Sequence, residues 1–185
     1  MSAAPPEHPE RPRDLVDRIT EQWGAVRPDL DLETLATVAR LLRLAELLNV
    51  EVAKRLEKLE LSMPWFEVLA ALRRRGEPYR LTPTELLRSV LRTSGAMTSR
   101  LDGMERAGLI RRVQNPDDRR SVLVELTQRG RTLADRAITM HVANERAILD
   151  ALTPQEQAQL NDLLAKLLPS LEPRPARRTA ADPAN

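Results

Sequence analysis

The segment from Leu81 to Gly130 constrains the fold of this chain most strongly, because it carries signals for two helices and a hairpin in a fixed order. Its Thr82-Pro83-Thr84-Glu85 run matches a capping box, in which the threonine caps a helix and the glutamate reaches back to the cap. That helix is predicted to run to Leu91, and Arg92-Thr93-Ser94-Gly95 is predicted to form a tight turn. A helix and a turn are therefore expected before the next apolar run.

A second, short helix is predicted from this turn to Ala107. Its apolar residues Met97, Leu101 and Met104 recur at i, i+4 and i+7 and form a narrow stripe that faces a core. Gly108 is expected to end the helix in a left-handed C-terminal cap. The small hydroxyl side chains point elsewhere and fit the major groove of DNA, where they reach base edges and phosphates. These candidate DNA contacts are Thr93, Ser94, Thr98 and Ser99.

A basic β-hairpin is predicted next, with β-prone runs over 109–113 and 122–126 and a turn-rich loop between them. An arginine on an extended loop can enter the minor groove, whose negative potential attracts a guanidinium. The formal net charge is only +2, so a DNA-binding surface must be local. The candidates are Arg111, Arg112, Arg119 and Arg120. Either the short helix or the basic hairpin alone would be interpreted as a solvated surface. Together they predict a winged helix-turn-helix that binds duplex DNA.

Several motifs in this region resemble the MarR family of bacterial transcription regulators. They are Thr93–Asp102, Ala107–Arg112, Pro116–Ser121 and Val124–Thr127, and the resemblance extends from Leu35 to Leu168. It implies a dimer on a palindromic operator, with Arg120 in the minor groove and Asp118 as the residue that orients it. The implied partners are double-stranded DNA and a second copy of the chain.

The rest of the chain is predicted to be helical, and its apolar faces are too wide for one wing domain to cover. A second capping box, Thr153-Pro154-Gln155-Glu156, opens the last helix. A second copy of the chain would cover these faces and would present two recognition helices about one helical turn apart. A bundle within one chain is the alternative. The expected fold is mainly α with a small β-hairpin wing and flanking dimerisation helices.

The expected organisation is one MarR-like domain with a disordered segment at each end. These segments are 1–13 and 172–185, and the domain covers 14–171. Within the domain we expect an extra N-terminal helix over 14–27, dimerisation helices over 31–60 and 127–171, and the winged helix-turn-helix over 64–126.

The extra N-terminal helix resembles a feature of the urate-responsive MarR subgroup. The resemblance implies an effector pocket made by Trp23, Glu67, Arg74 and Arg100, although the subgroup usually has aspartate where this chain has Glu67. An indole offers a flat face to a ring, and an arginine can bind an anionic oxygen bidentately. The implied effector is a small anion such as urate, a purine or a citrate-like acid. Alternatively, Trp23 only anchors its helix, and Glu67 and Arg74 form an ordinary ion pair.

Composition excludes several function classes. The chain has no cysteine, which rules out a disulfide, a thiolate metal site and a thiol redox switch. It shows no paired carboxylates, nucleophile or phosphate loop of an enzyme, so no catalytic residue, cofactor or metal is expected. His141 could titrate near neutral pH at a dimer interface, although a lone histidine is more often packed or solvated.

Targeting signals are also missing from the sequence. The start from Met1 to Arg13 lacks the apolar run of a secretory signal, and no apolar segment is long enough to span a bilayer. The sequence therefore predicts a cytoplasmic protein with no membrane partner.

Two hypotheses for the function remain. The chain is a dimeric repressor that a ligand releases from DNA, or a constitutive winged-helix DNA-binding or protein-interaction module without an effector. A change in operator binding on addition of candidate anions would separate them.

Overall fold

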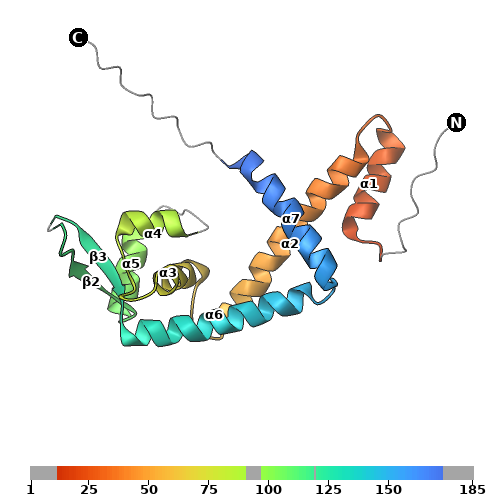
Figure 1. Cartoon of the computed structure of the whole chain (residues 1–185). Helices are drawn as coiled ribbons and strands as arrows, with labels where there is room; N and C mark the ends of the chain where they lie inside the picture. Colours follow the sequence, from red (N-terminus) through yellow and green to blue (C-terminus); the bar gives the residue numbers. More distant parts are fainter. Residues whose placement is uncertain (1–11, 91–96, 119, 173–185) are drawn as a thin grey trace, which may run out of the picture. The chain divides into compact units, whose positions relative to one another are not determined.

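In this computed structural model, which describes residues 12–90, 97–118 and 120–172, the chain is mainly helical, as predicted, and contains a small antiparallel sheet (Figure 1). The chain divides into a first unit, residues 1–138, and a second unit, residues 139–185. The elements in chain order are α1 (Leu15–Val26), α2 (Leu32–Glu57), α3 (Met63–Arg74), β1 (Arg80–Leu81), α4 (Pro83–Ser89), α5 (Met97–Arg106), β2 (Ile110–Gln114), β3 (Val122–Leu126), α6 (Gln128–Leu149) and α7 (Pro154–Leu171).

Both predicted capping boxes are confirmed. At the start of α4, the Thr82 hydroxyl accepts a hydrogen bond from the Glu85 backbone N–H at 3.2 Å, and the Glu85 carboxylate accepts from the Thr82 N–H at 2.7 Å. Thr153 and Glu156 repeat the pattern at the start of α7, at 3.3 and 2.8 Å. Each box satisfies two N–H groups that have no partner within the helix. Gly108, just after α5, has a φ of 68°, so the predicted left-handed cap is also confirmed.

Two features differ from the sequence-based expectation. Helix α4 ends at Ser89 rather than at Leu91, because Val90 is buried and adopts an extended conformation. The strand β1 was not predicted. It has two residues, and it pairs with β3 in a sheet of order β1-β3-β2 within the described residues.

The core of the first unit lies around α3, which packs against α2, α4, α5 and β3. Met97, Leu101 and Met104 of α5 are all buried, which confirms the predicted core-facing stripe. The largest fully buried side chains come from α2 to β3 and are Leu56, Val68, Leu69, Leu72, Leu86, Leu101, Met104, Ile110 and Val124. This packing fixes the orientation of α5 and determines which of its residues remain exposed.

Helix α1 forms the predicted short amphipathic helix and packs against α2. The Arg40 guanidinium on α2 donates to Asp14 at 2.8 Å and to Asp17 at 2.6 Å. The hydrogen bond from Arg40 lowers the pKa of Asp14, which also caps α1. Trp23, on the same helix, keeps 43% of its surface exposed.

Helix α6 begins in tight contact with the segment that ends α5. The Thr127 hydroxyl donates to the carbonyl oxygen of Gly108 at 2.7 Å. A Cβ atom on Gly130 would lie 1.9 Å from the carbonyl oxygen of Leu109, so only glycine fits at this position. The start of α6 is therefore fastened to the chain immediately after α5.

The second unit consists of the end of α6, from Thr139, and α7. In the turn between the two helices, the Gln157 side chain donates to the carbonyl oxygens of Leu149 and Leu152, both at 3.0 Å. Along α7 a row of leucines is 36–77% exposed, and its members are Leu163, Leu164, Leu167, Leu168 and Leu171. Among the described helices, none combines the length and the apolar character needed to cross a membrane.

Candidate DNA-binding surface and effector residues

The exposed side of α5 carries Thr98 and Ser99, as expected of side chains that would approach a major groove. They leave the helix away from its buried stripe. Thr93 and Ser94, the other two hydroxyl candidates, lie outside the described residues. Both side chains are therefore accessible to DNA, and their contact with base edges stays a prediction.

The wing is the hairpin of β2 and β3, which lies beside α5 in Figure 1. Asn115 and Ser121 close the loop through a side-chain hydrogen bond of 2.8 Å and a backbone hydrogen bond of 3.2 Å. The Asp118 carboxylate accepts a hydrogen bond from the Arg120 backbone N–H at 3.0 Å. Asp118 thus fixes the backbone at Arg120, whose side chain is exposed. Arg119 lies outside the described residues.

One carboxylate, that of Glu125 on β3, joins the three strands. It is paired across the sheet with Arg80 on β1 and with Arg111 on β2, and both guanidinium groups donate to it. Glu125 is only 7% exposed, whereas the side chain of Arg111 is 61% exposed. Burial by itself would raise the pKa of Glu125, but the hydrogen bonds from Arg111 and Arg80 bring it below the ordinary value.

Glu125→Gln should lower the free energy of unfolding at pH 7 by about 1–2 kcal/mol, because two guanidinium groups lose a charged acceptor. The pKa of Glu125 is lower in the folded state than its unfolded value of about 4.3. Its contribution is therefore complete at neutral pH and is lost as the pH falls through the folded pKa. Urea unfolding of both proteins between pH 7 and pH 3 should show the difference shrinking on acidification. A difference that is independent of pH would contradict this assignment.

Arg112 connects the wing to α5. Its guanidinium donates to Asp102 at 2.6 Å and to Glu105 at 2.5 Å, and its backbone N–H donates to Glu105 at 2.9 Å. These hydrogen bonds raise the pKa of Arg112, and the bond that Arg112 donates to Asp102 is the largest cause. Two carboxylates thus neutralise a charge that we predicted to face DNA. Arg112 positions β2 against α5, and its contact with DNA stays a prediction.

Three of the four effector candidates lie on two helices that pack together. Glu67 and Arg74 are on α3, and Arg100 is on α5. Glu67 and Arg100 are partly buried, and Arg74 donates to the carbonyl oxygen of Ser89 at the end of α4. Arg74 therefore already contacts the helix that precedes α5.

The fourth candidate, Trp23, lies near the start of α2. A Cβ atom on the adjacent Gly24 would be 3.2 Å from a methyl group of Leu32, the first residue of α2. The buried residues of α2, Val52 and Leu56, are at its other end, from which the chain leads into α3. At 1.5 Å per residue, the helix axis from Leu32 to Leu56 is roughly 36 Å long. Trp23 and the candidates on α3 therefore lie near opposite ends of α2, which the spacing of these residues in the sequence did not indicate.

Comparison with known proteins identifies the family. Residues 61–122 match the model of the MarR family. The HTH-type transcriptional regulator PecS of Dickeya dadantii (strain 3937) is 39% identical over 152 residues, which cover 82% of this chain and 92% of PecS. The chain belongs to the MarR family.

Solved MarR structures show the same fold. AbsC, a MarR family transcriptional regulator from Streptomyces coelicolor, has a TM-score of 0.66 at 26% identity. The match covers 77% of this chain and 95% of the AbsC chain. A mutant MarR from E. coli in complex with operator DNA has a TM-score of 0.63 at 27% identity. The match covers 80% of this chain and 98% of the E. coli chain. This member of the MarR family is thus a DNA-binding transcription regulator with a winged helix-turn-helix, and not an enzyme.

Sequence reasoning missed a cluster of side chains around Tyr79, the residue before β1. The ring of Tyr79 contacts the guanidinium groups of both Arg73 and Arg131, with centroid distances of 5.2 and 5.0 Å. Arg73 also donates to Asp135 of α6 at 2.6 Å. Such cation–π contacts position the residue before β1 between α3 and α6. Tyr79 is the chain's one tyrosine, but nothing local in the sequence connects it to Arg131. Among the described residues, no group of three or more potential ligands could hold a metal ion.

Proposed function

We propose that this MarR-family protein is a repressor that binds a palindromic operator as a homodimer and is released by a small anionic ligand. The observation that carries the DNA-binding part is the wing, where Asp118 fixes the backbone of the exposed Arg120 and Arg112 holds β2 to α5. A hydrogen-bonded loop with an exposed arginine near its tip suits the minor groove while α5 occupies the adjacent major groove. The regulator would act in the cytoplasm, where bacterial DNA lies.

Homodimerisation is supported by apolar side chains that the described chain leaves exposed. The leucine row of α7 and a second set on α2 are large, and monomeric proteins rarely expose such contiguous surfaces. The α2 set comprises Val38, Leu42, Leu44, Leu47 and Val50, with exposures of 46–69%. A two-fold partner with the same helices would cover them and would present a second α5 to the other half of a palindrome.

Release by an anion is supported by Arg74 and Arg100. Arg74 donates to the Ser89 carbonyl at the end of α4, so an anion that binds this guanidinium would compete with that contact. Such competition would change the segment that leads into α5, and a ligand shifts an equilibrium only through its differential affinity for two states. Urate or a related purine is the first candidate, and a citrate-like acid is the second.

The alternative, a constitutive winged-helix module without an effector, is favoured by one observation. Trp23 lies near the start of α2, and α3 follows the other end of that helix. In that case Trp23 would only anchor α1 on α2.

Trp23→Ala should raise the urate concentration that releases DNA by about tenfold, because the urate ring loses the indole face on which it would stack. Trp23→Phe, which retains an aromatic face, should stay close to the parent protein. The measurement is a gel-shift titration of urate on the palindrome that the protein protects in footprinting upstream of its own gene. If Trp23→Ala releases DNA at the parental urate concentration, Trp23 is not part of the effector site. If neither urate nor citrate changes the affinity of the parent protein, the constitutive alternative holds.

A further inference from the structure

The short helix α5 contains a glycine whose presence is explained by a neighbouring side chain. A glycine inside a helix is less favourable than an alanine, and Gly103 does not have the positive φ that favours glycine at Gly108. A Cβ atom on Gly103 would lie 3.0 Å from Cζ2 of Trp65 and 3.8 Å from two more atoms of the same ring. Because carbon atoms pack best at about 3.5–4.0 Å, Gly103 makes room for the indole.

Trp65 belongs to the first turn of α3, around which the core of the first unit is built. Its backbone N–H donates to the carbonyl oxygen of Ser62 at 3.1 Å, and Phe66 and Leu69 of the same helix are buried. The indole itself is only partly buried. The backbone of Trp65 is therefore held in place, while its ring lies at the edge of the contact between α3 and α5.

The opposite side of α5 is held by the wing. Arg112 of β2 donates to the carboxylates of Glu105 and Asp102. Two positions along a helix correspond to a rotation of about 200°, so Gly103 and Glu105 lie on nearly opposite sides of α5. The indole of Trp65 and the guanidinium of Arg112 thus contact α5 from two sides.

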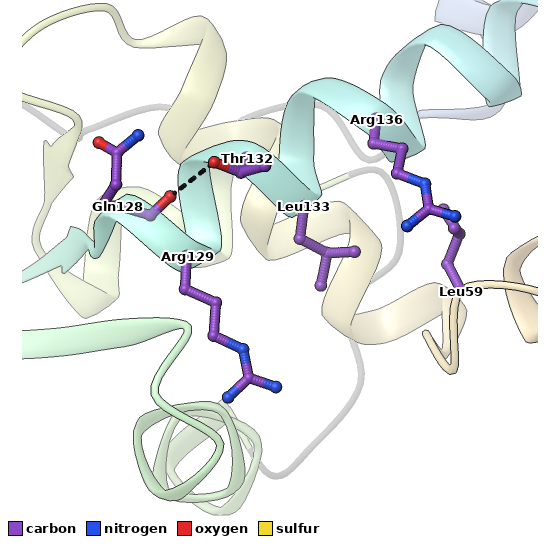
Figure 2. A pocket seen from close by; sticks show the side chains of 6 residues that line it. All are labelled: Leu59, Gln128, Arg129, Thr132, Leu133 and Arg136. Atoms are coloured by element: carbon purple, nitrogen blue, oxygen red, sulfur yellow. Dashed lines mark hydrogen bonds between the residues drawn. The ribbon is translucent and has the colours of Figure 1, made fainter.

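The C-terminal end of α5 is fixed separately, by the first turn of α6. The Thr127 hydroxyl donates to the Gly108 carbonyl oxygen, and a guanidinium nitrogen of Arg129 lies 4.0 Å from the position that a Cβ atom on Gly108 would take. Figure 2 shows Arg129 extending from this turn of α6. A displacement of α5 at Gly103 would therefore swing the N-terminal part of the helix, which carries Ser99 one turn before Gly103.

We infer that Trp65 is a positioning residue for DNA recognition, because its indole, packed on Gly103, sets where the N-terminal part of α5 lies. The inference rests on the proposed role of α5 in reading DNA. Contacts with base edges depend on the placement of a recognition helix in the groove, whereas phosphate contacts are independent of sequence. A displaced α5 should therefore lose more affinity for the operator than for unrelated duplex DNA.

Gly103→Ala tests this inference by adding one methyl group where the indole lies. Alanine favours the helix, so a loss of affinity would come from the contact with Trp65 and not from a weaker α5. We expect the operator affinity to fall about fivefold, which is the effect of one unfavourable base pair, and the affinity for a scrambled duplex to change less than about twofold. Gel-shift titrations on the footprinted palindrome and on a scrambled duplex of equal length measure both affinities.

Trp65→Phe provides the compensating change. Alone, it should lower the operator affinity about threefold, because the smaller ring no longer fills the space beside Gly103. Combined with Gly103→Ala, it leaves room for the methyl group, and the double variant should return to within about twofold of the parent protein. Losses that simply multiply in the double variant would overturn the inference.

Fluorescence reports on the contact directly. The chain has two tryptophans, so Trp65 is the one that remains in a Trp23→Phe background. Gly103→Ala in this background should move the emission to longer wavelength, because the added methyl group displaces the indole toward solvent. Unchanged emission together with the parental operator affinity would show that the indole does not position α5, and would overturn the inference.

Gly24→Ala is the matched control. A Cβ atom on Gly24 would also meet a neighbouring side chain, at 3.2 Å from a methyl group of Leu32, but α1 lies outside the winged helix-turn-helix. This variant should leave the ratio of operator affinity to scrambled-duplex affinity unchanged. An equal loss for both duplexes in Gly103→Ala would indicate a smaller folded fraction instead of a displaced α5, and would overturn the inference.

Ser99→Ala separates this inference from the proposed role of α5. If Ser99→Ala lowers the operator affinity and Gly103→Ala does not, the positioning role of Trp65 is overturned while α5 keeps its role in reading DNA. If neither variant lowers the operator affinity, the proposed role of α5 fails together with the inference.

Discussion

A chain that ends at Ala151 should be monomeric and should bind a palindromic operator at least about a hundredfold more weakly than the full chain. The truncation removes α7 and with it the leucine row from Leu163 to Leu171. If these side chains cover each other in a two-fold partner, their loss removes much of the apolar area that drives association. A monomer engages one half-site at a time and loses the gain in effective concentration that a second half-site provides.

Sedimentation velocity gives the oligomeric state, and gel-shift titration gives the affinity. A chain that ends at Glu172 is the matched control, because it retains all of α7 and should remain dimeric. Leu167→Glu in the full chain is a milder test, since it places a charge within the leucine row while keeping the helix. A stable dimer of the chain that ends at Ala151 would show that the interface lies elsewhere.

Arg120→Ala should lower operator affinity by about ten- to a hundredfold while leaving the dimer and the helix content unchanged. The side chain is exposed at the wing tip, and its backbone is already fixed by Asp118, so the substitution should remove the proposed DNA contact without loosening the loop. A lost phosphate or groove contact should also reduce the slope of log affinity against log salt concentration by about one.

Arg120→Lys provides the comparison for this second prediction. Lysine retains the charge but lacks the planar fork of a guanidinium, so it should keep the salt slope and recover only part of the affinity. Gel shifts at several salt concentrations measure both quantities, and circular dichroism monitors the helix content. Parental affinity in Arg120→Ala would contradict the assignment of this hairpin as a DNA-binding wing.

Elements with local signals were predictable from the sequence. The capping boxes at Thr82 and Thr153 depend on residues three positions apart, and Gly108 ends α5 through its own backbone conformation. The buried stripe of α5 follows from helical spacing alone. The order of helices and the hairpin was therefore predicted correctly, even though one strand was missed.

Features that depend on distant partners could not be predicted. Strand β1 exists only through pairing with a segment about 45 residues later, and two residues carry no periodicity. The basic cluster suggested four similar arginines, but Arg111 and Arg112 bond to carboxylates on β3 and α5. The position of Trp23 near the start of α2 results from the packing of α1, which pairs Arg40 with two aspartates more than 20 residues earlier. Sequence spacing contains none of this information.

The carboxylate of Glu125 has a consequence for the motions of the three-stranded sheet that contains the wing. Because both outer strands are anchored to one group on the central strand, neither can peel away without disturbing the anchor of the other. Backbone amides of β1, β2 and β3 should then exchange with solvent at similar protection, as one opening unit, rather than fraying from the edges inward. A wing held in such a sheet would already be ordered before it binds DNA, so ordering it would reduce the free energy of binding only slightly.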